Sequence, residues 1–165
     1  MHFPLHPETP PEGRALLDLF AGREALLQDM MQRLDGLFAE AGLPWAGETR
    51  TMTYNSRLAQ ELAAWAVNQP DGDGIHDALF KAYFVDSVNL ADQDALVAVA
   101  ETVGLPADGA RQVLEQRSFR DAVDRDWQRS TRLGLRGVPA YVVGRRAVVG
   151  AQPYETLLQL VTEAG

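Results

Sequence analysis

Apolar residues recur every three or four positions through much of residues 11–134, which is the spacing of an amphipathic α-helix. The first such stretch starts after Pro11 and ends before Gly42 and Pro44, and Gly22 is expected to divide it into two helices. Its apolar stripe consists of Leu16, Leu19, Phe20, Leu26, Leu27, Met30, Leu34, Leu37 and Phe38. The pattern predicts a region that is largely helical.

The same spacing predicts four further helices, over residues 57–67, 75–86, 92–103 and from 118 to near 134. Asp92 is expected to cap the third of these helices and Gly104 to end it. Asp71-Gly72-Asp73-Gly74 begins like a calcium-binding loop but lacks the bidentate Glu that such a loop requires. We interpret this run as a solvated turn, and the sequence predicts no metal site.

Near the end of the chain the pattern changes from helical to β-type spacing. Residues 140–143 and 147–149 are short β-forming runs on either side of Gly144-Arg145-Arg146, which predicts a β-hairpin. Pro139 stands at the entry of the first strand, where a missing N–H costs little. Gln152-Pro153 then fits the start of a closing helix, because proline is favoured at the first helical position.

Composition limits the classes to which the protein can belong. With 165 residues, of which 46% are hydrophobic and 23% charged, it has the size and balance of one globular domain. The formal net charge of −8 argues against general nucleic-acid binding, which depends on cationic neutralisation of phosphates. The sequence shows neither a signal peptide nor an apolar run near the roughly 18 residues that span a bilayer. We predict a cytoplasmic protein with no nucleic-acid and no membrane partner, and its preference for Arg over Lys suggests a GC-rich bacterial genome.

The reactive groups in the sequence are few. There is no cysteine, which excludes disulfides, Cys-based zinc sites and a Cys nucleophile within these residues. The three histidines, His2, His6 and His76, are too scattered to suggest a metal site, and no phosphate-binding loop or nucleophile elbow occurs. The sequence therefore predicts no catalytic residue and no cofactor of its own.

Several short segments, in this order, resemble one known family: Phe3-Pro4-Leu5-His6-Pro7 with Pro10-Pro11-Glu12-Gly13, Asn55-Ser56-Arg57-Leu58-Ala59, Leu79-Phe80-Lys81-Ala82-Tyr83-Phe84, Gly137-Val138-Pro139 and Gly150-Ala151-Gln152-Pro153. Each is weak alone, but together they cover nearly the whole chain. On them the chain resembles the DsbA-like thioredoxin superfamily, in particular its FrnE-type branch of dithiol-disulfide isomerases. That branch is similar to the 2-hydroxychromene-2-carboxylate isomerases and the kappa-class glutathione transferases.

The resemblance implies a thioredoxin-like α/β fold of the DsbA type with a large all-helical insertion. Residues 1–8 would be a remnant of the second thioredoxin strand, with residues 2–5 extended. Residues 11–134 would be the helical insertion, and residues 135–165 the C-terminal hairpin and helix, all in a single compact unit. The family's proline before the hairpin is usually cis, so the Val138–Pro139 peptide bond is expected to be cis.

The chain departs from the family where the chemistry is done. Relatives begin with a first strand and a helix whose N-terminus holds Cys-x-x-Cys, or a serine in the isomerase branch, whereas Met1 stands where the second strand is expected. The expectation is therefore an N-terminally truncated fold that is inactive as written, because a helix N-terminus is what lowers the thiol pKa. A start codon placed too far downstream, a deliberately shortened chain and a true degenerate member are the competing explanations.

The resemblance also implies substrate contacts at four residues, Val138, Pro139, Asn55 and Arg57. Val138 and Pro139 would present backbone to a substrate strand, while Asn55 and Arg57 would face the cleft of the isomerase branch. Asn55 is equally interpreted as a helix N-cap. Where relatives often have His, this chain has Gln60, which removes an acid–base group.

Two hypotheses for function remain open. In the first, the chain belongs to a thiol–disulfide oxidoreductase or isomerase whose catalytic segment lies outside these residues, acting on a peptide or small thiol. In the second, it is a non-catalytic module that binds such a ligand or a second copy. A glutathione-dependent isomerase, with glutathione as cofactor, is a lesser alternative. The exposed edge of strand 140–143 predicts a homodimer, unless residues 1–5 move into the vacant position beside it.

Overall fold

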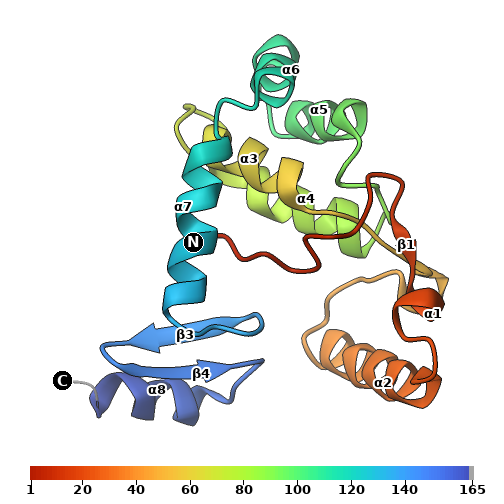
Figure 1. Cartoon of the computed structure of the whole chain (residues 1–165), viewed down its shortest axis with the longest axis vertical. Coiled ribbons are helices and arrows are strands. Elements are labelled where there is room, and N and C mark those ends of the chain that lie inside the picture. The colour runs from red at the N-terminus through yellow and green to blue at the C-terminus, as the bar shows by residue number, and fades with distance from the viewer. Residues whose placement is uncertain (164–165) are drawn as a thin grey trace. The chain divides into compact units, whose positions relative to one another are not determined.

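The computed structural model describes residues 1–163, except for the side chain of Glu48, and separates into two units (Figure 1). The helical unit comprises residues 6–122, and the terminal unit comprises residues 1–5 together with the chain from Val123 onward. The expected single compact unit therefore is not what the structure shows. The boundary falls inside a helix, α7 (Arg120–Arg132), rather than at residue 134 as expected.

The helical unit is built from short and medium-length helices, and the apolar spacing predicts all of them except the last. They are α1 (Leu16–Leu19), α2 (Glu24–Glu40), α3 (Arg57–Ala66), α4 (Ile75–Phe84), α5 (Gln93–Thr102) and α6 (Ala107–Gln116). Two short 3-10 helices, η1 (Gly47–Thr49) and η2 (Gly72–Gly74), and a small antiparallel pair, β1 (Arg14–Ala15) with β2 (Met52–Thr53), connect them. Helices α1 and α2 are separated at Gly22, which has a φ of 75° and breaks the helix as expected.

The core of this unit lies among helices α3 to α6. Its fully buried members are Leu62, Ala66, Ile75, Leu96, Ala100, Ala110 and Leu114. Each buried Leu or Ile contributes about 1.5–3 kcal/mol relative to an exposed position. Helix α2 differs from the others, because Leu26, Met30 and Leu37 are exposed and only Leu27 is buried. The apolar stripe predicted for α2 is therefore only partly covered by the described residues.

Local signals explain where these helices start and end. The Asp92 carboxylate accepts a hydrogen bond from the Ala95 backbone N–H at 3.1 Å, the expected cap of α5. Gly104 follows with a φ of 82°, a conformation that favours glycine. Helix α6 was not predicted. Its sequence signal is Pro106 at the N-cap position followed by Ala110 and then Val113 and Leu114 at helical spacing.

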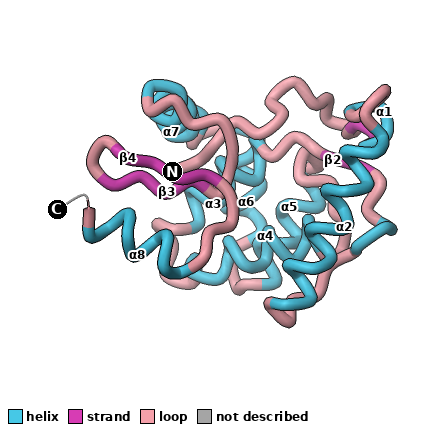
Figure 2. The backbone as a smooth tube through the Cα atoms, turned by 90° about the horizontal axis from the view of Figure 1, so that it is seen from below, coloured by secondary structure: helices cyan, strands magenta, loops and turns pink. Residues whose placement is uncertain are grey.

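The terminal unit contains the predicted hairpin and closing helix. Strands β3 (Ala140–Val143) and β4 (Arg146–Val149) pair antiparallel, with Ala140 opposite Val149 and Val143 opposite Arg146. Arg146 is thus a strand residue, and only Gly144 and Arg145 form the turn. Helix α8 (Tyr154–Thr162) packs against both strands, as Figures 1 and 2 show.

The first eight residues do not form the expected strand. Pro4 and Pro7 have no N–H to donate, Leu5 N–H bonds to Phe3 O, and His6 adopts a φ of 49°. The backbone N–H of His2 donates to the Asp126 carboxylate of α7 at 2.8 Å. Within the described residues the second sheet contains only β3 and β4, so residues 1–5 do not pair beside β3. This overturns the alternative in which they fill the vacant position.

Candidate functional site

Asn55 holds together two parts of the helical unit. Its Nδ2 donates to Pro7 O at 2.9 Å and to Thr9 O at 3.0 Å, and its Oδ1 accepts the Arg57 backbone N–H at 2.9 Å. The N-cap position of α3 itself belongs to Ser56, so Asn55 precedes the cap rather than forming it. Both amide hydrogens are used within the chain. The structure therefore gives Asn55 a structural role, and its contact with substrate stays a prediction.

Arg57 belongs to a buried ion-pair cluster that centres on Glu61. Arg57 Nε donates to Glu61 Oε1 at 2.7 Å, and Arg57 Nη2 donates to Arg120 O at 2.9 Å. Arg117 binds the same carboxylate through two bonds, from Nε to Oε2 and from Nη2 to Oε1, each 2.7 Å long. The Glu61 side chain is fully buried, and that of Arg57 is 15% exposed. This Glu61 cluster joins α3 to the segment between α6 and α7.

The Glu61 carboxyl experiences two opposing influences. Burial is the largest single effect and raises its pKa, but hydrogen bonds and the positive charges of Arg117 and Arg57 together bring the pKa below its ordinary value of 4.5. Glu61 is therefore charged at neutral pH. Sequence reasoning missed this residue, although a signal exists. Glu61 lies three positions after Leu58 and four before Trp65, on the apolar face of a helix, where an unpaired charge would be costly.

Val138 and Pro139 form an exposed loop that leads into β3. The Val138 side chain is 49% exposed, Pro139 is also exposed, and the peptide bond between them is cis. Pro139 O accepts the Gly150 N–H at 2.8 Å, which joins the loop to the end of the hairpin. Among the described residues, no hydrogen bond engages the backbone of Val138. This loop belongs to the terminal unit, whereas Asn55 and Arg57 belong to the helical unit. The four predicted contacts are thus divided between the two units, and their contact with substrate stays a prediction.

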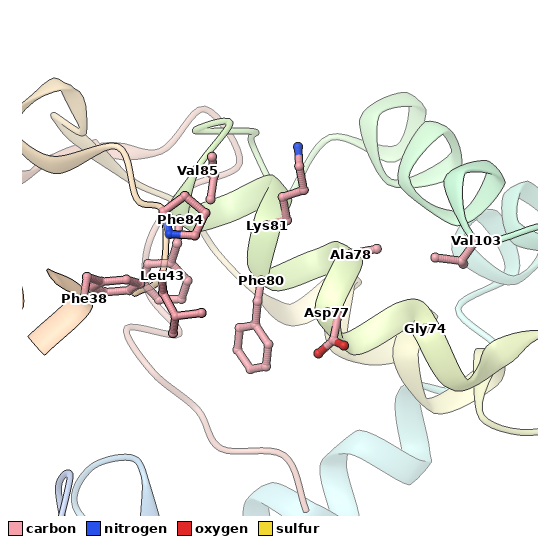
Figure 3. A pocket seen from close by; sticks show the side chains of 11 residues that line it. Phe38, Leu43, Gly74, Asp77, Ala78, Phe80, Lys81, Phe84, Val85 and Val103 are labelled. Atoms are coloured by element: carbon pink, nitrogen blue, oxygen red, sulfur yellow. The ribbon is translucent and has the colours of Figure 1, made fainter. Parts of the chain in front are cut away.

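The helical unit also contains a large apolar pocket along α4, with a volume of about 790 Å³ (Figure 3). Most of the side chains that line it are apolar: Phe38, Leu43, Pro44, Ala78, Phe80, Phe84, Val85 and Val103. Figure 3 shows Phe38 and Leu43 toward one end and Val103 toward the other. Its size falls within the range of about 300–1,000 Å³ that is typical of ligand pockets.

Aromatic contacts shape one end of this pocket. Phe38 stacks on Trp45 with 4.9 Å between ring centroids, and Trp45 Nε1 donates to the Asp35 carboxylate at 2.8 Å. The apolar spacing of α4 would also allow Phe80 to face the core, but this residue is 61% exposed. The reason is that Leu79 and Ala82 of the same helix are the residues turned to the core. Sequence spacing alone could not separate these two faces, since both carry large apolar residues.

The described part of the chain shows neither a cluster of metal ligands nor a membrane-spanning helix. Among the side chains that the structure describes, no three of His, Cys, Asp or Glu are grouped as metal ligands. In the same part of the chain no helix combines the length and the apolar character that crossing a bilayer requires.

Comparisons with known proteins identify similar chains. A family model described as a DsbA-like thioredoxin domain matches residues 1–162. The crystal structure of a probable DsbA oxidoreductase from Streptomyces coelicolor is similar with a TM-score of 0.85 and 26% identity, covering 98% of this chain and 72% of that one.

A candidate protein disulfide isomerase from Nitrosomonas europaea has a TM-score of 0.64 at 18% identity, covering 99% of this chain and 76% of that one, and thus shows the fold alone. Among curated proteins, the uncharacterised YwbO of Bacillus subtilis is 27% identical over 95 residues. That match covers 57% of this chain and 48% of YwbO, so the chain spans about half the length of this curated relative.

Proposed function

The chain belongs to the DsbA-like thioredoxin domain family, and we propose on this basis that it forms the substrate-binding part of a FrnE-type thiol–disulfide oxidoreductase or isomerase. The reactive thiolate of such an enzyme attacks a disulfide sulfur and forms a mixed disulfide. Because the sequence holds no cysteine, this thiolate has to be supplied by residues outside it. We place the protein in the cytoplasm of a bacterium and assign it no cofactor. Glutathione would enter only if the chain served the isomerase branch.

The observation that carries this proposal is the open backbone of Val138. Its N–H and C=O are unengaged among the described residues, and the side chain beside them is exposed. Such a backbone can pair with an extended peptide, which adds affinity through main-chain hydrogen bonds without demanding a particular sequence. The likeness to the Streptomyces coelicolor protein supports the thiol–disulfide chemistry.

The proposal is tested by adding a segment that carries the reactive cysteines. A strand and helix carrying Cys-x-x-Cys, taken from a DsbA-like relative, would be fused ahead of Met1, and insulin reduction by dithiothreitol would be followed by turbidity. We expect activity well above background from the fusion and none from the unfused chain, which lacks a thiolate. Measurable activity of the unfused chain, or an inactive fusion that is folded by circular dichroism, would contradict the proposal.

A variant pair tests the role of the Val138 backbone. In the fusion, Val138→Pro removes the N–H, whereas Val138→Ala removes side-chain atoms and keeps it. We expect the proline variant to raise the KM for an unfolded polypeptide about tenfold, equivalent to about 1.4 kcal/mol, and the alanine variant to stay near the parent. Equal KM values for the two variants would remove the backbone from substrate binding.

Dimerisation is a second candidate role, favoured by apolar surface in the terminal unit. Tyr141 and Val142 on β3 are partly exposed, and no described strand pairs with the outer edge of β3. Unpaired edges beside apolar residues tend to associate. We expect the chain to be a homodimer by light scattering and Val142→Lys to make it a monomer. Val161→Lys on the exposed side of α8 is the control that should stay dimeric. A wild-type monomer of 18.1 kDa at high concentration would contradict this.

A further inference from the structure

A second, small pocket in the helical unit has a chemistry different from that of the apolar pocket. Its volume is about 70 Å³, and its lining consists of Thr49, Arg50, Thr51, Met52, Tyr54, Tyr83 and Ser87. Five of these seven side chains carry a hydroxyl, and Arg50 is the one charged residue in the described lining. A pocket of this size accommodates a group of a few non-hydrogen atoms rather than a whole metabolite.

The guanidinium of Arg50 lies against two aromatic rings. Its guanidinium carbon lies 4.6 Å from the ring centroid of Tyr83 and 5.6 Å from that of Phe84. Nη2 of Arg50 donates a hydrogen bond to the Tyr83 hydroxyl, which lies 3.1 Å from Thr53 Oγ1. Cation–π contacts and this chain of hydrogen bonds fix the orientation of the guanidinium. An arginine that is positioned in advance loses little conformational entropy when it binds a ligand.

Among the side chains that the structure describes, no anion pairs with the positive charge of Arg50. Its Nε is buried and has no hydrogen-bond partner, and none of the carboxylates that the structure describes, a set that does not include Glu48, forms an ion pair with the guanidinium. Arg57 and Arg117, by contrast, both bind Glu61. A buried donor without a partner is unfavourable by about 1–3 kcal/mol, and more when it is charged. Such a group in a native protein calls for an explanation, and a bound anion would supply one.

We propose that this pocket is a binding site for an oxyanion, a carboxylate or phosphate group of a small ligand, recognised by Arg50 together with Tyr83 and the neighbouring hydroxyls. A planar guanidinium matches the oxygen geometry of both groups, and hydroxyls complete their hydrogen bonds. The bound anion would provide the acceptor that Nε lacks and would offset the unpaired charge. All lining residues lie in the helical unit, so the site is independent of the thiol chemistry proposed above.

The test uses the unfused chain and two probe anions, inorganic phosphate for the phosphate group and acetate for the carboxylate. Each is titrated by isothermal calorimetry at fixed ionic strength, with sodium chloride as the reference salt. We expect saturable binding of one probe in the millimolar range, and the probe that binds identifies the group. Arg50→Gln should weaken that binding at least tenfold. Arg125→Gln, which removes an exposed arginine of α7, should leave it unchanged.

Two further variants keep the test decisive if Arg50→Gln does not fold. Arg50→Lys keeps the positive charge but loses the planar donor geometry, and Tyr83→Phe keeps the ring but loses the hydroxyl. We expect both to weaken binding several-fold while circular dichroism stays that of the parent. Absence of saturable binding by both probes, or equal affinities in the folded Arg50 and Tyr83 variants and the parent, would overturn the site. A loss of affinity in Arg125→Gln equal to that in Arg50→Gln would also overturn the site.

Discussion

Gly72→Ala is expected to destabilise the protein by about 3 kcal/mol, because the added methyl group has no space. A Cβ built on Gly72 would lie 1.7 Å from the backbone oxygen of Ala66 and 2.5 Å from its carbonyl carbon. Both atoms belong to the end of α3, whose packing is part of the core, so they cannot move as a flexible side chain would. The chain reverses here within a few residues, as the bond from Gly72 N–H to Gln69 O shows.

A matched glycine gives the control. Gly36 lies on the exposed face of α2, and a Cβ there would meet no atom within 4 Å. Gly36→Ala should therefore stabilise the helix by about 0.5–1 kcal/mol through helix propensity and unfolded-state entropy. Thermal unfolding by circular dichroism should show opposite shifts, with a fall of about 10 °C for Gly72→Ala. A melting temperature of Gly72→Ala equal to that of the parent would show that Gly72 does not lie as near to the end of α3 as the structure describes.

Gly72 also illustrates what the sequence could and could not reveal. The run from Asp71 to Gly74 was interpreted as a solvated turn, because Asp and Gly are typical of exposed turns. The structure makes it η2 and buries Gly72 against α3. A turn can be predicted from local composition, but the depth of one of its residues depends on how closely the preceding helix packs. That distance follows from tertiary packing, which no local pattern contains.

The helices and the hairpin were predictable for a physical reason. Their apolar spacing and their caps, such as Asp92, act over a few residues, so they appear directly in the sequence. The conformation of residues 1–8 was not predictable in this way, because a strand also needs a partner strand. His2 instead forms a hydrogen bond with Asp126 of α7. Predictions that rest on neighbours in the sequence therefore held better than those that rest on a distant strand.

The candidate sites follow the same division. The loop at Val138 could be identified from a short motif together with the hairpin that follows it. The Glu61 cluster could not be identified from a short motif. Arg117 is 56 residues away in the sequence and reaches Glu61 only through the packing of α6 against α3. The apolar pocket and the Arg50 pocket likewise combine segments that are remote in the sequence. Arg57 was predicted to contact substrate; the structure shows its ion pair with the buried Glu61, and the substrate contact stays a prediction.

Glu61→Gln is expected to lower the free energy of unfolding by about 3 kcal/mol at pH 7, because it leaves two arginines beside a neutral amide. The substitution preserves the volume of the side chain, so the loss reports the charge and its hydrogen bonds rather than a cavity. The Arg57 side chain is only 15% exposed, so its guanidinium cannot reach solvent unless α3 is disturbed. Urea denaturation of the variant and the parent measures the difference.

Glu163→Gln is the matched control for this buried cluster. Glu163 also pairs with an arginine, Arg146, but both side chains are largely exposed, at 43% and 56%. Exposed ion pairs contribute about 0–1 kcal/mol, so this variant should lose far less stability than Glu61→Gln. Equal losses in the two variants would show that burial does not govern the strength of the Glu61 cluster.

The pH dependence separates the charge of Glu61 from its shape. Because the folded-state pKa of Glu61 lies below its ordinary value of 4.5, its stabilisation is complete above that value and disappears as the pH falls through the folded-state pKa. The protonated carboxyl then resembles the neutral amide of glutamine. The difference in free energy of unfolding between the parent and Glu61→Gln should therefore be constant from about pH 7 to pH 5 and should disappear at lower pH. If this difference in free energy persists well below the ordinary pKa, the loss of stability comes from packing. The Glu61 cluster would then no longer be explained as a buried charge held by Arg57 and Arg117.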